Sequence, residues 1–227
     1  RAVSIQLGVK PLRNVQTPGL AVRFGRALSL YGALRMAART VVRALGIDPG
    51  VTGAWALIEV DKSRLGRFPH VLAVGDLPVT AVSVSARAAR KIDAAALEAA
   101  LSPLLVKADI VTVERLSAAP RISSTAAFSL GYTAGTIDAV LTKLGCQPVR
   151  VSPSVWKRAL LVPADKSAAR QRASALFGGA DHWPRESDHN RAEAALLALY
   201  GALTAGTADK RRNVSASASV GMPKLAA

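Results

Sequence analysis

Residues 41–60 read VVRALGIDPGVTGAWALIEV and decide the fold expected for this chain. The run from Val41 to Asp48 is β-branched and apolar and stops at Pro49-Gly50, which predicts a strand that ends at Asp48. A second run of the same kind, Gly53 to Val60, predicts the hairpin partner of that strand. The stretch therefore predicts the start of a β-sheet, with an acidic side chain where the first strand ends.

The rest of the chain continues with strand and helix patterns. Short apolar runs predict strands over 70–77, 108–114 and 147–151. Helices are predicted over 93–107, 124–144, 154–160, 166–177 and 190–203, with apolar residues at helical spacing in the longer segments. Asp93 is expected to cap the first helix, Gly145 to end the second, and Leu203 to face inward from the last. Three successive strands followed by helix–strand alternation predict an α/β fold, a mixed five-stranded sheet flanked by helices.

Composition narrows the class of partner. The chain has 227 residues, a net charge of +15 and one cysteine. A single cysteine excludes a disulfide-built scaffold, so Cys146 is expected to be a structural thiol. The sequence has no run of about 18 apolar residues without a charge, so no membrane span is predicted. The basic excess points to a polyanion, with nucleic acid ahead of an anionic membrane.

Most of this positive charge lies at the two ends of the chain. Residues 1–43 hold eight basic and no acidic residues, and residues 204–227 add a net +3, which leaves +4 for the middle. Residues 1–42 have the composition of an organelle transit peptide, and the same composition suits a disordered basic arm that binds DNA. The chain is therefore divided into this basic leader, a folded domain at 43–203 and a flexible Ser/Ala-rich tail at 204–227.

Four carboxylates stand where an α/β domain places its sites. Asp48 ends the first predicted strand, Glu114 ends the fourth, and Asp188 and Glu193 stand at the start of the last helix. If the two strands are neighbours, their ends converge at one edge of the sheet. Crowded carboxylates repel one another unless a divalent cation holds them, and oxygen ligands favour Mg²⁺ or Mn²⁺. Two such ions activate water against a phosphodiester, which makes a nuclease the leading class.

Each carboxylate also has an ordinary structural explanation. Asp48-Pro49-Gly50 is a common turn, a glutamate after a strand is often a surface residue, and Asp188 suits a helix cap. Only their joint placement favours a metal site.

A series of motifs runs in order through residues 44–203. The first is Leu45-Gly46-Ile47-Asp48-Pro49-Gly50, followed by Val113-Glu114, by Phe128-Ser129-Leu130-Gly131, by Pro153 to Arg158, by Asp165-Lys166-Ser167, and by Arg191 to Leu197. Together they resemble the acidic strands, the Leu-Gly helix, the two lysine motifs and the closing acidic helix of the RuvC-type Holliday junction resolvases. The Pro-Ser-Val-Trp-Lys-Arg and Arg-Ala-Glu-Ala runs look closer to the phage-type and chloroplast branches than to the bacterial enzyme. With the basic leader, the chain most resembles the plant and algal chloroplast branch.

The resemblance implies an RNase H-like fold, a homodimer, and paired symmetric nicks across a four-way DNA junction. It implies two Mg²⁺ ions per active site, with Mn²⁺ as a substitute, held by Asp48, Glu114, Asp188 and Glu193 as catalytic residues. It also implies the chloroplast nucleoid as location, with the mitochondrion as the alternative.

One departure from the family pattern concerns the last two ligands. Bacterial RuvC places them three residues apart, whereas Asp188 and Glu193 are five apart, which is about 500° on an ideal helix. Asp188 is therefore expected to precede the helix. His189 shares a helical face with Glu193 and is the alternative third ligand.

Basic residues before the closing helix are expected to bind DNA phosphates, although a solvated helix face would look the same. They are Lys157, Arg158, Lys166 and Arg170. Lys166 is also placed to stabilise negative charge in the transition state. Arg121, in the loop after Glu114, is expected to enter the junction and contact bases.

The helix predicted at 124–144 carries further candidates for DNA binding. Gly131 and Gly135 lie one helical turn apart, and they would admit either DNA or another helix at close range. Tyr132 is expected to stack on a base, whereas Phe128 is expected to pack in the core.

The leading hypothesis is therefore a metal-dependent endonuclease that acts on four-way DNA junctions. The alternatives are another RNase H-like nuclease that cuts RNA/DNA hybrids or flaps, and a non-catalytic junction-binding or nucleoid DNA-binding protein. A basic membrane-associated protein is disfavoured by the nearly neutral middle of the chain.

Overall fold

A computed structural model describes residues 40–64, 67–84, 87–116, 122–163 and 165–205. Residues 1–39 of the predicted leader, nearly all of the predicted tail, and Arg121 lie outside the described residues. Among the described residues, no helix combines the length and the hydropathy needed to cross a lipid bilayer.

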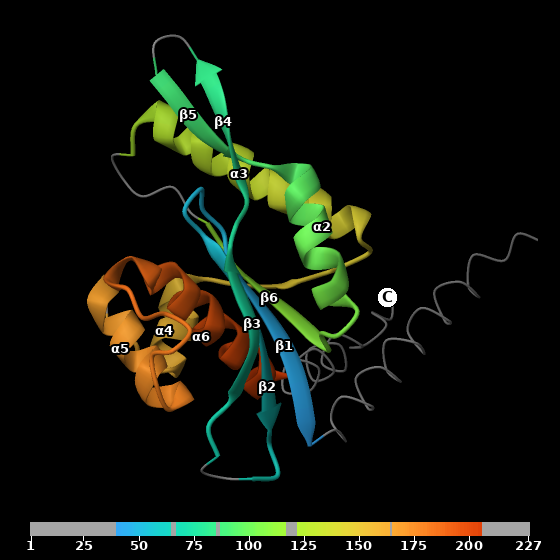
Figure 1. The fold of residues 1–227 in the computed structure, drawn as a ribbon, viewed down its shortest axis with the longest axis vertical. Coiled ribbons are helices and arrows are strands. Elements are labelled where there is room, and N and C mark those ends of the chain that lie inside the picture. Colours follow the sequence, from blue (N-terminus) through green and yellow to red (C-terminus); the bar gives the residue numbers. More distant parts are fainter. Residues whose placement is uncertain (1–39, 65–66, 85–86, 117–121, 164, 206–227) are drawn as a thin grey trace, which may run out of the picture.

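Five strands form the central sheet, in the order β3-β2-β1-β6-β7 (Figure 1). They are β1 (Val41–Asp48), β2 (Ala54–Asp61), β3 (His70–Asp76), β6 (Ile110–Glu114) and β7 (Val149–Val151). The first three form an antiparallel meander, while β6 runs parallel to β1 and β7 runs parallel to β6. The predicted mixed five-stranded sheet is confirmed.

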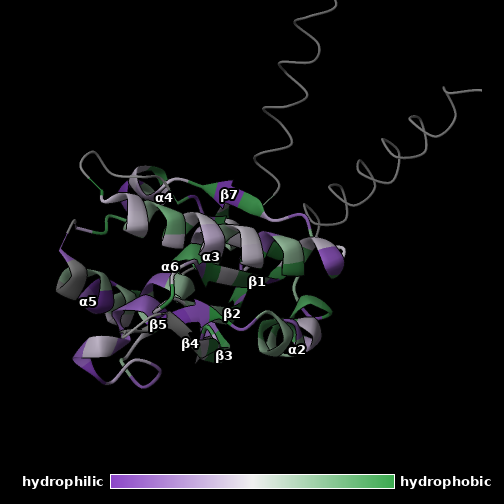
Figure 2. Ribbon diagram, turned by 90° about the horizontal axis from the view of Figure 1, so that it is seen from above, coloured by the Kyte–Doolittle hydropathy of each residue, from purple (hydrophilic) through white to green (hydrophobic). Residues whose placement is uncertain are grey.

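Helices cover both faces of this sheet (Figures 1 and 2). They are α2 (Ala94–Leu105) and α3 (Ser124–Lys143) on one face, and α4 (Pro153–Ala159), α5 (Lys166–Phe177) and α6 (His189–Thr204) on the other. Leu45 and Ile47 pack with the first pair, whereas Val42 and Ala44 pack with the second group. Because successive side chains of a strand point to opposite faces, β1 supplies both cores.

The two predicted cap residues are confirmed. The carboxylate of Asp93 accepts a hydrogen bond of 3.0 Å from the backbone N–H of Ala96 at the start of α2. Gly145 follows α3 with φ of +69°, a left-handed conformation that glycine adopts without steric cost at a helix end.

Helix α6 lies directly against β1 and β6. A Cβ atom added to Gly46 would lie 2.0 Å from the carbonyl oxygen of Ala194, and one added to Gly201 would lie 2.1 Å from the Oγ1 atom of Thr112. Small residues on both sides therefore bring the helix backbone close to the sheet. This close approach places the start of α6 beside the carboxyl ends of β1 and β6.

Three sequence expectations differ from the structure. A hairpin of β4 (Val79–Val84) and β5 (Arg87–Ile92) was not predicted, because its second strand, RAARKI, carries few of the residues typical of strands and the Val-rich first strand therefore had no recognisable partner. Leu203 is 51% exposed, because Gly201 and Ala202 take the inward positions in the last turn of α6. Phe128 is 73% exposed and does not pack in the core, because the side of α3 that carries it turns away from the sheet.

Cys146 is half-buried, and burial raises the pKa of its thiol. A protonated thiol is a poor nucleophile, which agrees with the structural role expected for this residue.

Candidate active site

Asp48 and Glu114 lie side by side at the ends of two parallel strands. Ile47 of β1 pairs with Val113 of β6, and the next residue in each strand is the carboxylate. Side-chain alternation fixes their direction, since Ile47 and Val113 pack on the α2–α3 face. Asp48 and Glu114 therefore converge at one edge of the sheet, as predicted, and both point toward the face covered by α6.

Two polar contacts tie the start of α6 to this edge of the sheet. The Asn190 amide nitrogen donates to the backbone oxygen of Thr52, in the turn between β1 and β2. The Arg191 guanidinium donates two hydrogen bonds of 2.7 Å to the carboxylate of Asp76, where β3 ends. The helix that carries Glu193 is thus anchored to the first three strands.

Adjacent residues of α4 hold two of the candidate carboxylates. The indole N–H of Trp156 donates to the Oε2 atom of Glu114 at 2.7 Å. The Nζ atom of Lys157 lies 2.8 Å from the Oε1 atom of Glu193 and donates to it. Helix α4 therefore connects the end of β6 to the first turns of α6.

Burial raises the pKa of the Glu114 carboxyl above its ordinary value. The hydrogen bond from Trp156 opposes that rise, the negative charge of Glu193 adds to it, and the positive charge of Lys157 opposes it. The influence of Glu193 on Glu114 means that the two carboxylates share one electrostatic environment. A positive ion bound between them would lower the energy of both charges.

Asp188 is held in a different way. It ends the 3₁₀ turn η1 (Glu186–Asp188) and stands immediately before α6, as the five-residue spacing predicted. Its carboxylate is 4% exposed and accepts hydrogen bonds from the backbone and the guanidinium of Arg185, the shortest at 2.7 Å. The side-chain hydrogen bond from Arg185 lowers the pKa of Asp188.

The four predicted ligands do not form one cluster. No group of three or more His, Cys, Asp and Glu side chains in the described part of the chain is close enough to hold a metal ion. Instead, Asp188 accepts from Arg185, Glu193 from Lys157 and Glu114 from Trp156. That the four carboxylates share a metal site stays a prediction; without an ion, three of these mutually repelling carboxylates are each stabilised by a separate donor. His189, the alternative ligand, is the first residue of α6 and half-buried.

The predicted phosphate-binding residues occupy different environments. Arg158 is exposed on α4, and Lys157 is paired with Glu193. Lys166 is the first residue of α5, and its side chain lies outside the described structure. Arg170 has an internal role instead, because its guanidinium donates to the backbone oxygen of Pro184 at 3.3 Å and lies 3.5 Å from that of Trp183.

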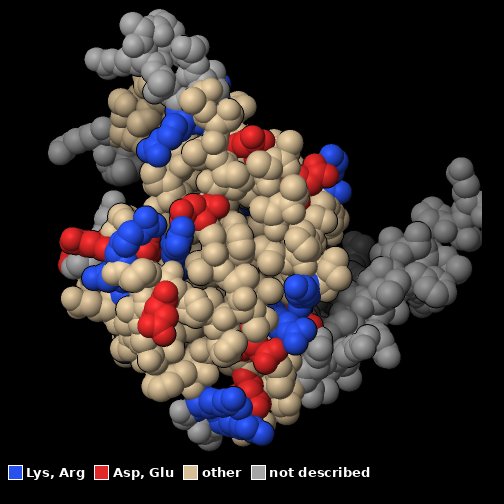
Figure 3. Space-filling view, viewed as in Figure 1, with Lys and Arg blue, Asp and Glu red and all other residues tan. Residues whose placement is uncertain are grey.

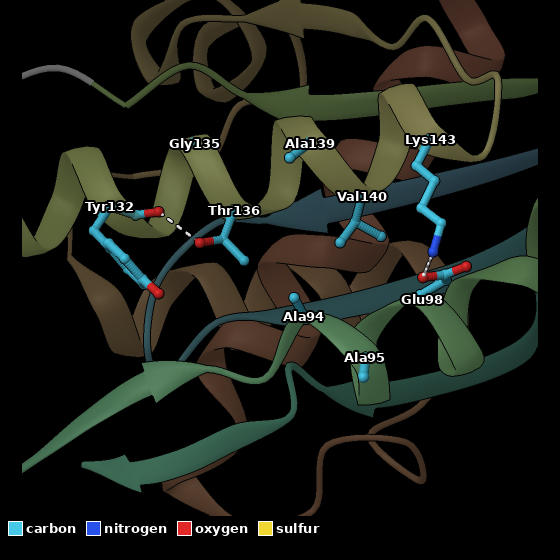
Figure 4. A pocket seen from close by; sticks show the side chains of 9 residues that line it. All are labelled: Ala94, Ala95, Glu98, Tyr132, Gly135, Thr136, Ala139, Val140 and Lys143. Atoms are coloured by element: carbon cyan, nitrogen blue, oxygen red, sulfur yellow. Dashed lines mark hydrogen bonds and ion pairs between the residues drawn. The ribbon is translucent and has the colours of Figure 1, made fainter.

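Helix α3 presents an open surface on the other face of the sheet. No atom lies within 4 Å of a Cβ added to Gly131 or Gly135, so neither glycine packs against another helix of the described chain. Tyr132 is 44% exposed and has the Lys91 ammonium 4.7 Å from its ring centroid. Gly135 and Tyr132 line an open groove of about 680 Å³ between α2 and α3 (Figure 4).

Several residues of the site were not singled out from the sequence. Trp156 stood in the quoted Pro-Ser-Val-Trp-Lys-Arg run, where a tryptophan that needs an acceptor for its N–H was the available signal. Arg185 and Asp188 are three positions apart, a spacing that allows local pairing, whereas nothing in the sequence pairs Asn190 with Thr52. The Arg191–Asp76 contact joins residues 115 positions apart and has no local signal.

Comparison with solved structures identifies the fold. The chain is similar to Thermus thermophilus RuvC, with 22% sequence identity and a TM-score of 0.50 over 74% of this chain and 96% of that one. It is also similar to T. thermophilus RuvC in complex with a Holliday junction substrate, with 21% identity, a TM-score of 0.48 and the same coverage. The fold is therefore the RNase H-like fold of RuvC. No family model matches the sequence, and no curated protein matches it either.

Proposed function

We propose that this protein is a Holliday junction resolvase, an endonuclease that nicks four-way DNA junctions with the help of a divalent cation. The carrying observation is that Asp48 and Glu114 end neighbouring parallel strands on the face covered by α6, with Glu193 close enough to affect the pKa of Glu114. The ordered motifs at residues 44–203, which resemble RuvC-type resolvases, supply the reaction class.

The donor atoms at this site suit a hard cation. Asp48, Glu114 and Glu193 offer carboxylate oxygens, which Mg²⁺ and Mn²⁺ prefer over nitrogen or sulfur. These three residues would hold the metal after a rearrangement in which Glu193 exchanges Lys157 for the ion, since no three such side chains are close enough in the described part of the chain; Asp188, which is nearly fully buried against Arg185, would serve the fold. When bound, divalent ions supply an activated water and stabilise the leaving oxygen of the phosphodiester.

The protein's own side chains would orient the site and its substrate. Trp156 donates a hydrogen bond to the Glu114 carboxylate and so orients it. The Lys157 ammonium, which donates to Glu193, would lie close to a DNA phosphate bound in this site. Arg158 on the same helix is exposed and would contact the DNA backbone. The described face in Figure 3 carries small mixed groups of both charges. Since the two ends of the chain carry +11 of the net charge of +15, general attraction to DNA is assigned to them.

We infer that two copies act together, because a four-way junction requires two symmetric cuts. The groove between α2 and α3 is the surface assigned to the second copy. Small side chains line it, at Ala94, Ala95, Gly135 and Ala139, so a helix backbone can approach closely. Location in the chloroplast nucleoid remains a prediction.

A cleavage assay tests the proposed function. Full-length protein is mixed with labelled four-way junctions of several core sequences, with Mg²⁺, with Mn²⁺ or with chelator. Duplex, flap and RNA/DNA hybrid substrates are the comparison, and Asp48→Asn is the inactive control. The expected result is paired symmetric nicks on junctions alone, lost in the variant and with chelator.

Two outcomes would replace the proposal. Equal cutting of flaps or hybrids would make the protein a general RNase H-like nuclease. Tight junction binding without nicks in any core sequence or metal would make it an architectural DNA-binding protein.

A further inference from the structure

Trp156 is the contact that fixes the direction of Glu114. Its side chain is fully buried, and its indole N–H donates to one carboxylate oxygen at 2.7 Å. A buried indole N–H needs an acceptor, so the bond is expected to persist. With Oε2 occupied by this donor, Oε1 is the oxygen left to contact a cation.

The charge of the donor matters as much as its position. An indole is neutral, so it orients Glu114 and leaves the negative charge of the carboxylate available to a cation. Arg185 is a cation and largely cancels the charge of Asp188. Glu114 is therefore suited to bind a cation, whereas Asp188 is suited to stabilise the fold.

Helix α4, which carries Trp156, is packed into the core. The indole is part of the core formed with Leu160, Ala169 and Leu196 from the surrounding helices. The next residue, Lys157, reaches Glu193 and lies 5.2 Å from the Trp156 ring centroid. Any shift of α4 would move the partners of both carboxylates together.

We propose that Trp156 is a positioning residue of the candidate active site, which orients Glu114 for a divalent cation through a neutral hydrogen bond. The inference rests on the proposed cation-dependent nuclease. It adds that cation affinity depends on a residue that does not touch the ion.

Trp183 provides a matched control. It is also fully buried in the same core, and its indole N–H donates to a side-chain oxygen, that of Ser174, at 2.9 Å. Trp156→Phe and Trp183→Phe thus remove the same atoms from similar surroundings, and only the first variant releases Glu114. Titration calorimetry with Mn²⁺ and with Mg²⁺ on the full chain then compares the two.

Trp156→Phe is expected to weaken cation binding at least tenfold, as loss of an outer partner of a metal ligand does, while Trp183→Phe stays within about twofold of wild type. Equal affinities for Trp156→Phe and wild type would overturn the inference, and so would a wild-type protein that binds neither ion. Cleavage of junctions is not part of this measurement. A wild type that binds Mn²⁺ but cuts no junction would refute the proposed function and leave the positioning role in place.

A second measurement covers the case in which Trp156→Phe does not fold. The full chain is labelled with 5-fluorotryptophan, and the fluorine resonances of its three tryptophans are assigned with Trp55→Phe and Trp183→Phe. Added Mg²⁺ is expected to shift the Trp156 resonance and to leave that of Trp183 in place. Calorimetric binding without a shift at Trp156 would contradict the inference.

Discussion

At the scale of single residues, the partner of each carboxylate decides its role. Asp188 and Glu193 stand five positions apart, yet Asp188 is covered by Arg185 while Glu193 faces Lys157 and Glu114. Arg185 is itself 65% exposed, so its pair with Asp188 lies at the surface and stabilises the fold only modestly. We therefore expect neutral substitutions at Asp188 and Glu193 to differ in their effects on stability and on cleavage.

Asp188→Asn is expected to lower the free energy of unfolding by about 1 kcal/mol and to change cleavage only a few-fold. Glu193→Gln is expected to lower stability by a similar amount, because it breaks the pair with Lys157, but to reduce cleavage roughly 100-fold or more, because it removes a proposed cation ligand. Urea unfolding and junction cleavage, measured on both variants, check the contrast. Loss of cleavage in Asp188→Asn with full cleavage in Glu193→Gln would reverse the assignment.

The stability effect of Asp188→Asn also has a defined pH dependence. The pKa of Asp188 is lowered in the folded protein by its hydrogen bonds to Arg185. The stabilisation is therefore complete above the ordinary pKa of an aspartate and is lost as the pH falls through the lowered value. The difference in stability between wild type and Asp188→Asn should shrink in acid.

At the scale of secondary-structure elements, the contact between α6 and β1 sets the geometry of the site. It depends on the absence of a side chain at Gly46, where a Cβ atom would lie 2.0 Å from the Ala194 oxygen and 2.5 Å from the Ala198 nitrogen. These are backbone atoms, so relief would require movement of the whole helix. Such a movement would also carry Glu193 away from Glu114.

Gly46→Ala is expected to lower the free energy of unfolding by about 2–3 kcal/mol and to reduce cation affinity. Gly131→Ala is the control, since its new Cβ would enter open space on a helix. That change should raise stability by about 0.5–1 kcal/mol. Thermal unfolding measures the stability of both variants. A Gly46→Ala protein as stable as wild type would contradict the close contact between α6 and β1.

At the scale of the whole molecule, the two faces of the sheet carry different surface features. The α4–α5–α6 face contains the candidate active site, and the α2–α3 face carries the open groove at Gly135. The unpredicted hairpin of β4 and β5 extends beyond the central sheet next to α3 (Figure 1). Under the proposed function, this division would leave the α2–α3 face for a second copy and the other face for DNA.

Ala139→Arg places a charge in the groove between α2 and α3 and is expected to convert a dimer to monomers. Ala99→Arg, at an exposed position of α2 that does not line the groove, should have no such effect. Analytical ultracentrifugation reports the mass of each. If Ala139→Arg stays dimeric, the second copy binds elsewhere.

The sequence by itself determined the five strands of the sheet, the main helices and the placement of Asp48 and Glu114 at strand ends. These features follow from local patterns, because a strand of apolar residues and the turn after it lie within a few positions of each other. The same local rules missed the hairpin of Val79–Val84 and Arg87–Ile92, because its second strand is poor in typical strand residues and left the first without a recognisable partner.

Only the tertiary structure decided which donor each carboxylate accepts from. Trp156 and Glu114 are 42 positions apart, Lys157 and Glu193 are 36 apart, and Arg191 and Asp76 are 115 apart. Such pairs form because the sheet and α6 bring distant segments together, and no periodicity in the sequence encodes them. For the same reason, the sequence pattern suggested four converging carboxylates, whereas only the structure gave Asp188 to Arg185, Glu193 to Lys157 and Glu114 to Trp156.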